Sequence, residues 1–124
     1  MKNAISWFQI PVLDIERSTK FYGTILSVEF AITEIMSAKV AIFPYDHESG
    51  NVGGALYCGQ SYVPGIHGSL VFLNAGNDLS VVLEKVEEAG GSILMTKTAI
   101  NNNNDFIAYI TDSEGNRVGL HSNF

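Results

Sequence analysis

Hydrophobic and polar positions follow two different patterns along the chain, and the patterns alternate. Residues 4–10 are rich in aromatic and β-branched side chains, which is typical of a strand. A helix ending near Leu26 is predicted next, because apolar or small residues recur at three- and four-residue steps, at Ile15, Ser18, Tyr22 and Ile25. Three further segments have the composition of strands: 28–36, 38–44 and 52–58.

The second half of the chain gives the same order of elements. Residues 69–75 predict a strand, and a helix follows with Leu79, Val82, Val86 and Ala89 on one face. Gly90 is well suited to end that helix, because glycine readily adopts a left-handed conformation. Three more strands are predicted at 92–98, 105–111 and 117–121, with the run Asn101–Asn104 as a hairpin loop.

The two halves are similar enough to indicate an internal repeat. Asp14, a good helix N-cap, recurs as Asp78, 64 positions later, and Gly50-Asn51 recurs as Gly115-Asn116, 65 positions later. We therefore predict one α+β domain over 1–124, built from two tandem β-α-β-β-β modules at 1–60 and 67–124. Curved mixed sheets would surround a cleft. A chance likeness between two α/β halves is the alternative.

One helix for four strands leaves one face of each sheet uncovered, so that face packs on a partner or lines a cavity. In the last strand Val118 and Leu120 suit the helix side, which leaves Arg117, Gly119 and His121 on the other face. The same alternation leaves Trp7 and Gln9 on that face of the first strand and Tyr57 on that of the fourth.

Composition narrows the classes of function. The 124 residues are 46% hydrophobic and 16% charged, as in globular proteins. The net charge is −6 and the seven basic residues do not cluster, which argues against nucleic-acid binding. No apolar run is long enough for a membrane span, and no signal-peptide pattern is present, so a cytoplasmic protein is expected. The single cysteine excludes an internal disulfide and a zinc site built on thiolate pairs.

The whole chain resembles the vicinal oxygen chelate superfamily, which includes glyoxalase I, bleomycin-resistance proteins and extradiol dioxygenases. The resemblance is carried by four segments: WFQIPVLDIERSTKFY, GNVGGAL, LVFLN before a helix ending in EEAGG, and DSEGNRVGLHS. The last is the most specific, because a D-x-x-G-N/Y-x-hydrophobic-x-L signature closes most domains of this superfamily. The subgroup that the chain looks most like is related to lactoylglutathione lyase and has no established reaction.

The resemblance implies a divalent metal held by four strand residues, typically His or Gln, Glu, His and Glu. In this sequence the four positions fall at Trp7, Ala55 (or Leu56), Leu70 and Gly119, none of which coordinates a metal. None of the thirteen carboxylates is predicted on the cavity face of the four strands concerned. We therefore expect no metal site and no cofactor.

The candidate ligand-binding residues are those of the uncovered faces together with the aromatic side chains near them: Trp7, Gln9, Phe43, Tyr57, Phe72, Arg117 and His121. The aromatic members form either a wall for a ligand or part of the core. His121 either contacts a ligand and moves protons or makes a structural hydrogen bond at the end of a sheet. It is the candidate catalytic residue if there is one.

Two functions from different classes remain, besides a purely structural or interaction role. The first is a metal-free protein that binds a flat or aromatic small molecule, as bleomycin-resistance proteins do. The alternative is a lyase- or isomerase-like enzyme that uses His121, with Gln9 or Arg117 as a donor. A homodimer is expected, because open sheet edges are usually covered and because the resemblance implies it.

Overall fold

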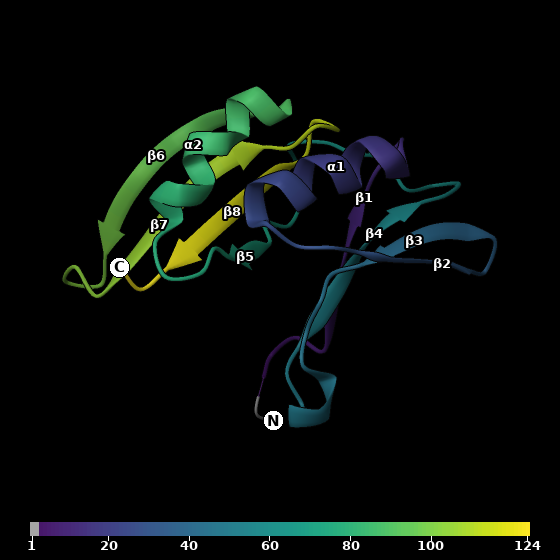
Figure 1. The fold of residues 1–124 in the computed structure, drawn as a ribbon, viewed down its shortest axis with the longest axis horizontal. Helices are drawn as coiled ribbons and strands as arrows, with labels where there is room; N and C mark the ends of the chain where they lie inside the picture. Colours follow the sequence, from purple (N-terminus) through teal and green to yellow (C-terminus); the bar gives the residue numbers. More distant parts are fainter. Residues whose placement is uncertain (1–2) are drawn as a thin grey trace.

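The computed structural model describes residues 3–124, which form two helices and eight strands in two four-stranded sheets (Figure 1). The first half contains β1 (Trp7–Pro11), α1 (Ile15–Leu26), β2 (Ala31–Ile35), β3 (Ala38–Ile42) and β4 (Gly53–Cys58). The second half contains β5 (Phe72–Asn74), α2 (Leu79–Ala89), β6 (Ser92–Ile100), β7 (Asp105–Thr111) and β8 (Arg117–Ser122). Within residues 3–124 neither helix has the length and apolarity of a membrane span.

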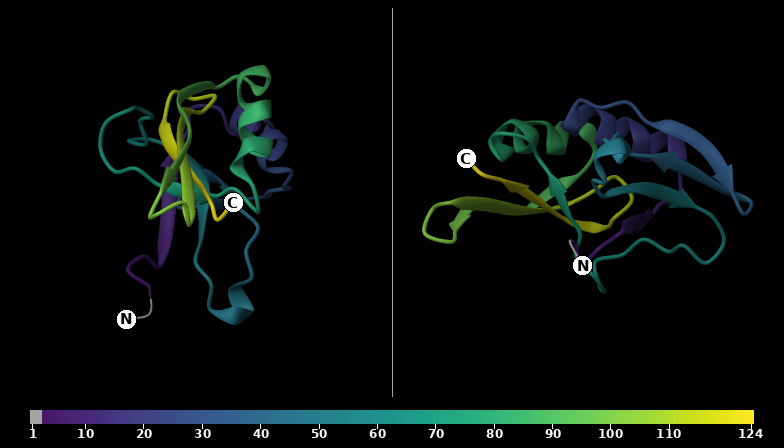
Figure 2. Two further views of the ribbon diagram at one scale, coloured as in Figure 1. Left: turned by 90° about the vertical axis from the view of Figure 1, so that its left-hand side faces the viewer. Right: turned by 90° about the horizontal axis from the view of Figure 1, so that it is seen from below.

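The strand order is β1-β4-β3-β2 in the first sheet and β5-β8-β7-β6 in the second. In each sheet the first strand runs parallel to its neighbour and the other pairs are antiparallel. The predicted α+β fold of two mixed sheets is therefore confirmed, and the sheets do not close into a barrel. The two helices lie next to each other and cover one side of both sheets (Figures 1 and 2).

The predicted helix ends are confirmed. The side chain of Asp14 accepts a hydrogen bond from Arg17 N, and that of Asp78 accepts one from Ser80 N, so both are N-caps. Gly90 ends α2 with φ 112°, whereas α1 ends at Ser27, which adopts the left-handed conformation at φ 56°.

Several strand bounds differ from the sequence pattern: the predicted strands 28–36 and 38–44 shrink to Ala31–Ile35 and Ala38–Ile42, and 92–98 extends to Ile100. β1 and β5 have a visible cause. β1 begins at Trp7 because its partner strand begins at Gly53, so residues 4–6 have nothing to pair with. β5 is limited to three residues because only Phe72–Asn74 pair with β8. The predicted Asn101–Asn104 loop is confirmed, and Asn101, Asn102 and Asn103 all have positive φ, which asparagine tolerates better than most residues.

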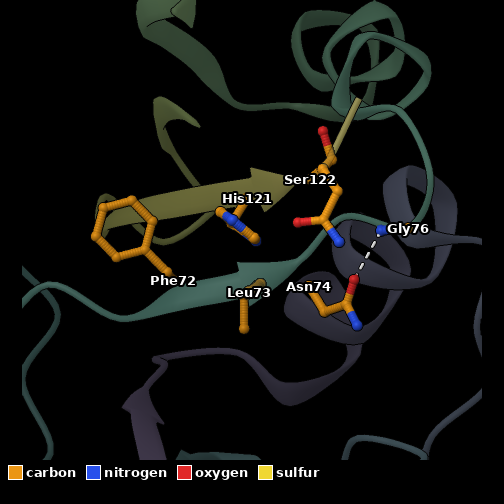
Figure 3. A pocket seen from close by; sticks show the side chains of 7 residues that line it. Phe72, Leu73, Asn74, Gly76, His121 and Ser122 are labelled. Atoms are coloured by element: carbon orange, nitrogen blue, oxygen red, sulfur yellow. Dashed lines mark hydrogen bonds between the residues drawn. The ribbon is translucent and has the colours of Figure 1, made fainter. Parts of the chain in front are cut away.

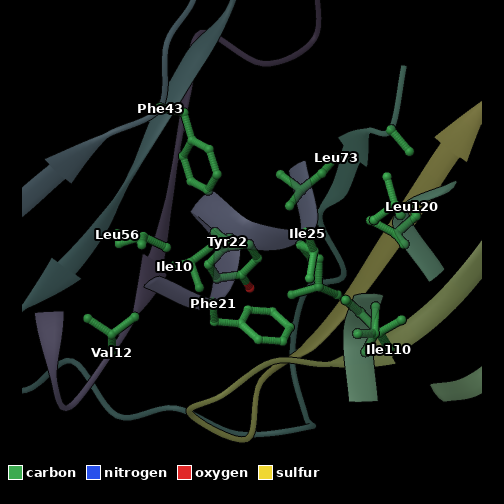
Figure 4. Packing of buried hydrophobic residues seen from close by; sticks show 14 of the residues in the cluster. Ile10, Val12, Phe21, Tyr22, Ile25, Phe43, Leu56, Leu73, Ile110 and Leu120 are labelled. Carbon is green, nitrogen blue, oxygen red and sulfur yellow. The ribbon is translucent and has the colours of Figure 1, made fainter. Parts of the chain in front are cut away.

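Both halves contribute to a single hydrophobic core beneath the helices (Figure 4). Tyr22 and Ile25 of α1 lie in the same cluster as Leu56 of the first sheet and Ile110 and Leu120 of the second. Each of these side chains is at most 1% exposed. The two halves therefore share their main core, and a smaller apolar cluster lies on the other face of the first sheet.

The β7–β8 turn of the second half is docked onto the start of α1 in the first half through Glu114. Its Oε1 accepts hydrogen bonds from the N–H groups of Leu13 and Asp14 at 2.9 and 3.0 Å. Arg17 Nε donates to Oε2 at 2.6 Å, and the Glu114 side chain is fully buried. Burial opposes ionisation, but the hydrogen bonds from Arg17 and from the two backbone N–H groups outweigh it and lower the pKa of Glu114 to about 2.

Two further residues of the same turn complete the junction. Tyr22 Oη donates to Asp112 Oδ2 at 2.6 Å, and Asn116 Nδ2 donates to the carbonyl of Pro11 at 2.7 Å. Burial and the adjacent Asp112 carboxylate raise the pKa of Tyr22 well above its usual value, so the hydroxyl remains a donor. Asp112, Glu114 and Asn116 of the DSEGN segment therefore join the two halves, and we call these three residues the turn clamp.

We expect Glu114→Gln to lower the free energy of unfolding by roughly 2 kcal/mol near neutral pH, because bonds to a carboxylate are stronger than bonds to an amide. Arg17 is half exposed, so solvent screening keeps the loss below what the whole pKa shift would give. Because the pKa of Glu114 is lowered in the folded state, its ionised carboxylate stabilises the folded protein at pH values above the ordinary pKa of 4.5. This stabilisation is lost as the pH falls from 4.5 toward 2.

Urea unfolding at several pH values checks this. The difference between the wild type and Glu114→Gln should shrink as the pH falls through that window. Glu88→Gln, which changes an exposed carboxylate on α2, is the matched control and should have little effect at any pH. A difference that stays constant from neutral pH to pH 2 would contradict the assignment.

Candidate functional site

The strand register places the predicted first-sheet residues on the face opposite the helices. Trp7 lies beside Gly53 and Gln9 beside Ala55, and Tyr57 follows on the same face of β4. Gln9 is exposed, whereas Tyr57 is buried and its ring lies 5.2 Å from that of Tyr62. Trp7 and Gln9 thus border an open face, while Tyr57 fills a small second apolar cluster.

The corresponding face of the second sheet is built around β8. The register pairs Phe72 with Gly119 and Asn74 with His121. The Phe72 ring lies directly over Gly119, because a Cβ added there would be 2.5 Å from the ring. Only glycine leaves room for this contact, and the ring is in turn 6.0 Å from that of Tyr109.

His121 is held by a carboxylate at the far end of this face. His121 Nε2 lies 2.9 Å from Asp105 Oδ1, and Asn101 Nδ2 donates to Asp105 Oδ2 at 3.0 Å. The hydrogen bond from Asn101 and then the one from His121 lower the pKa of Asp105, so this carboxylate is ionised at neutral pH. An imidazole oriented in this way can accept or donate a proton at its other nitrogen.

Arg117 begins β8 on the same face of the sheet. Its Nε is buried and has no hydrogen-bond partner among residues 3–124. The backbone N–H of Arg117 donates to Gly65 in the linker, so the linker covers the start of the strand. Arg117 Nε is therefore a buried donor that is left unsatisfied within the described residues.

A small cavity of about 300 Å³ lies beside His121 (Figure 3). Phe72, Asn74 and Ser122 are among its lining residues. Figure 3 shows Leu73 pointing away from Phe72, toward the core. The side chain of Asn74 is fixed by the backbone N–H of Gly76, which donates to Asn74 Oδ1 at 2.9 Å.

A much larger groove of about 910 Å³ lies between the two sheets on the helix side, on the other side of β5. Four stretches line it, namely 3–5, 43–45, 52–54 and 69–76, together with the side chains of Phe8, Leu26, Val28 and Val82. None of its lining residues is charged. Phe72, Leu73, Asn74 and Gly76 border both this groove and the small cavity, so β5 separates two adjoining spaces.

The structure distributes the predicted ligand-binding residues unequally. Phe72 lines both cavities, Phe43 lines the groove and His121 lines the small cavity, whereas Gln9, Tyr57 and Arg117 line neither. Phe43 belongs to the helix side of its sheet and is buried in the core, 4.8 Å from the ring of Phe30.

Trp7 and His121 do not meet in either cavity. Trp7 reaches the groove only through Tyr45, a lining residue whose ring is 5.8 Å from that of Trp7. Leu70 and Val71 also line the groove and were not among the predicted site residues, although their apolar run could have indicated it. Nothing in the sequence pattern distinguishes Tyr45.

The residues at the expected ligand positions do not fit a metal ion. Trp7, Ala55 and Gly119 offer no oxygen, nitrogen or sulfur ligand of the kind that divalent metals take. Leu70 lies before β5, where the residue opposite Gly119 is Phe72. Within residues 3–124 no three His, Cys, Asp or Glu side chains come together in a way that could hold a metal.

Comparison with known proteins gives one family match. The model of the glyoxalase/bleomycin resistance protein/dioxygenase superfamily matches residues 4–120. No curated protein sequence matches the chain.

Several solved structures have the same fold. A glyoxalase/bleomycin resistance protein from Albidiferax ferrireducens gives a TM-score of 0.72 at 15% identity, over 97% of this chain and 98% of that one. Glyoxalase I from Zea mays gives 0.67 at 23% identity over 95% of this chain, which spans only 45% of that enzyme. A hypothetical protein from S. aureus gives 0.67 at 21% identity over 98% of both chains. At these identities the likeness concerns the fold alone.

Proposed function

The chain belongs to the glyoxalase/bleomycin resistance protein/dioxygenase superfamily, and from this premise we propose that it is a metal-free protein that binds an organic small molecule. The observation that carries the proposal is the groove of about 910 Å³ between the two sheets. Ligand pockets commonly measure about 300–1,000 Å³ and are mostly apolar with a few placed polar groups. The groove has both properties.

The aromatic lining supports the binding of a flat ligand. Phe8, Phe43, Tyr45 and Phe72 all border the groove. Phe72 is 45% exposed, which is unusual for a phenyl ring that packs on a glycine, and the ring is available to stack on a ligand. The predicted residues Phe43 and Phe72 belong to this site, Asn74 at the end of β5 is one of its polar residues, and His121 lines the adjoining small cavity.

The metal-free state rests on the side chains at the expected ligand positions. We expect the purified protein to contain no stoichiometric divalent metal, because Trp7, Ala55 and Gly119 cannot bind one. Elemental analysis after gentle purification measures this, and formation of lactoylglutathione should be undetectable with added zinc or nickel. About one equivalent of zinc, nickel or iron held by the protein would contradict the proposal.

The groove itself is tested with three fluorescent probes of different charge: the neutral naphthyl ketone prodan, the anionic sulfonate ANS and the cationic dye thioflavin T. We expect at least one of them to bind in the micromolar range. Leu70→Trp places an indole in the groove and should lower the affinity for that probe roughly tenfold. Val63→Trp adds the same indole on the exposed linker, outside the groove lining, and should not weaken it.

Two results would overturn the proposal. One is the absence of binding by all three probes. The other is a Leu70→Trp variant that binds probes as the wild type does but has half the molecular mass in solution, since the groove would then be an interface between copies of the chain.

A homodimer is also part of the proposal, because both sheets have open edges and the edge strand β2 is exposed along its length. Ile32 is 58% exposed and Met36, at the tip of the β2–β3 hairpin, 96%. Apolar side chains on an open edge favour association with a second copy. Light scattering over a dilution series should give twice the chain mass of 13.5 kDa. A monomer at tens of micromolar would be the opposite result.

The second candidate is an isomerase or lyase activity with His121 as the acid–base group. The pairing of His121 with Asp105 at 2.9 Å, beside a cavity, favours it. Mass spectrometry of copurifying ligand before and after incubation separates the two candidates. Conversion that is lost in His121→Gln while binding is kept supports the enzyme, and an unchanged ligand supports the binding protein.

A further inference from the structure

We propose that the ligand of the groove is an uncharged molecule with an apolar, flat body and one hydrogen-bond acceptor, such as a carbonyl oxygen, that receives a hydrogen bond from Asn74. This inference rests on the proposed function and names the chemical class of the ligand. It is carried by the charges around the groove and by the way in which Asn74 is held.

The first step concerns charge. None of the lining residues is charged, although the chain as a whole has a net charge of −6. An ionised group placed in an apolar site without a partner loses its hydration and gains no ion pair. Arg117, the nearest candidate partner for an anion on β8, does not line the groove, and the cation of Lys97 is paired with Asp78 at 2.9 Å. The groove therefore selects neutral molecules.

The second step concerns Asn74, which borders both the groove and the small cavity. The backbone N–H of Gly76 donates to Oδ1 at 2.9 Å and fixes the orientation of the amide (Figure 3). Nδ2 must then be the free end, and no residue in 3–124 accepts a hydrogen bond from it. Nδ2 carries two N–H donors and no acceptor, so its partner on a ligand is an acceptor.

The third step concerns what surrounds this donor. Phe72 and Leu73 precede Asn74 on β5, and Val71 lines the groove before them. Phe72 and Asn74 lie on the same face of β5, whereas Leu73 points to the core, so a flat apolar body stacked on the Phe72 ring would bring a terminal oxygen to Asn74 Nδ2. The combination of an apolar wall and one oriented donor is typical of a site that recognises a neutral carbonyl compound.

The experiment compares the three probes on the wild-type chain and then changes only Asn74. We expect prodan, which is neutral and has a carbonyl, to bind at least about tenfold more tightly than ANS or thioflavin T. Asn74→Asp keeps the acceptor for Gly76 N–H but replaces the free donor with a carboxylate oxygen. The affinity for prodan should therefore fall about fivefold to tenfold. Asn77→Asp adds the same charge three residues away, outside the groove lining, and should change the affinity less than about twofold.

A spectroscopic measurement separates a lost hydrogen bond from a general loss of binding. A hydrogen bond to its carbonyl shifts the emission of prodan to longer wavelength, so the probe bound to Asn74→Asp should emit at shorter wavelength than on the wild type. Thermal unfolding of both variants checks that they are folded. Loss of affinity without the emission shift, or an equal loss in Asn77→Asp, would overturn the assignment of Asn74.

The outcomes for ligand class and for function remain distinct. If ANS or thioflavin T binds best and is weakened by Leu70→Trp, the groove binds ligands but the neutral class is wrong. If no probe depends on the groove, the proposed function fails. If prodan binds best and both its affinity and its emission depend on Asn74, the inference is supported.

Discussion

The buried carboxylate of Glu114 connects the two halves of the molecule, and the position of the other elements follows from that connection. Glu114 accepts hydrogen bonds from the backbone N–H groups of Leu13 and Asp14, which directly precede α1, and from the side chain of Arg17. These are donors that a helix start leaves unsatisfied, and an anion is stabilised there by the helix dipole as well. Asp112 and Asn116 extend the contact to Tyr22 and Pro11, so the turn clamp fixes the second sheet against the first. The shared core beneath the helices is buried only in this arrangement.

The groove exists because the junction is closed on one side only. The internal repeat relates each segment of one half to a segment of the other. The β7–β8 turn of the second half corresponds to the loop 46–51 of the first, and the start of α1 corresponds to the segment 75–78, before α2. In that loop Ser49 Oγ donates to Asp46 Oδ2, a hydrogen bond within the loop, whereas the three residues of the turn clamp bind Pro11, Tyr22 and the start of α1. The loop instead forms a short 3₁₀ turn, His47–Ser49, away from the helices (Figure 1). Phe43, Tyr45, Ala75 and Gly76 line the open space on this side.

Periodicity and capping residues predicted the helices, the succession of helix and strands along each half and the face on which Trp7, Gln9, Arg117 and His121 lie, because these depend on local alternation along the chain. The groove could not be predicted in this way. It depends on how the two sheets are set relative to each other, and on a loop that differs from its counterpart by one residue in length. The same limitation explains Phe43: alternation cannot tell which face a residue takes just beyond the end of a strand, and Phe43 follows β3 directly. The pairing of His121 with Asp105 spans two strands and is visible only once the register is known.

At one of the expected metal-ligand positions, Gly119, the absence of a metal-binding side chain is part of the packing. At Gly119, where the superfamily resemblance implies a carboxylate, even a Cβ would lie 2.5 Å from the ring of Phe72. At Gly53, the register partner of Trp7, a Cβ would lie 2.5 Å from the ring of Tyr45, which itself contacts Trp7. In both sheets an aromatic ring thus occupies the volume that a longer side chain would need. Introducing a carboxylate at Gly119 alone would displace Phe72, whose side chain borders both cavities, before it could approach a metal ion. The Phe72 ring therefore accounts for glycine in place of a carboxylate at position 119, and the Phe72 and Tyr45 rings form part of the apolar wall of the groove.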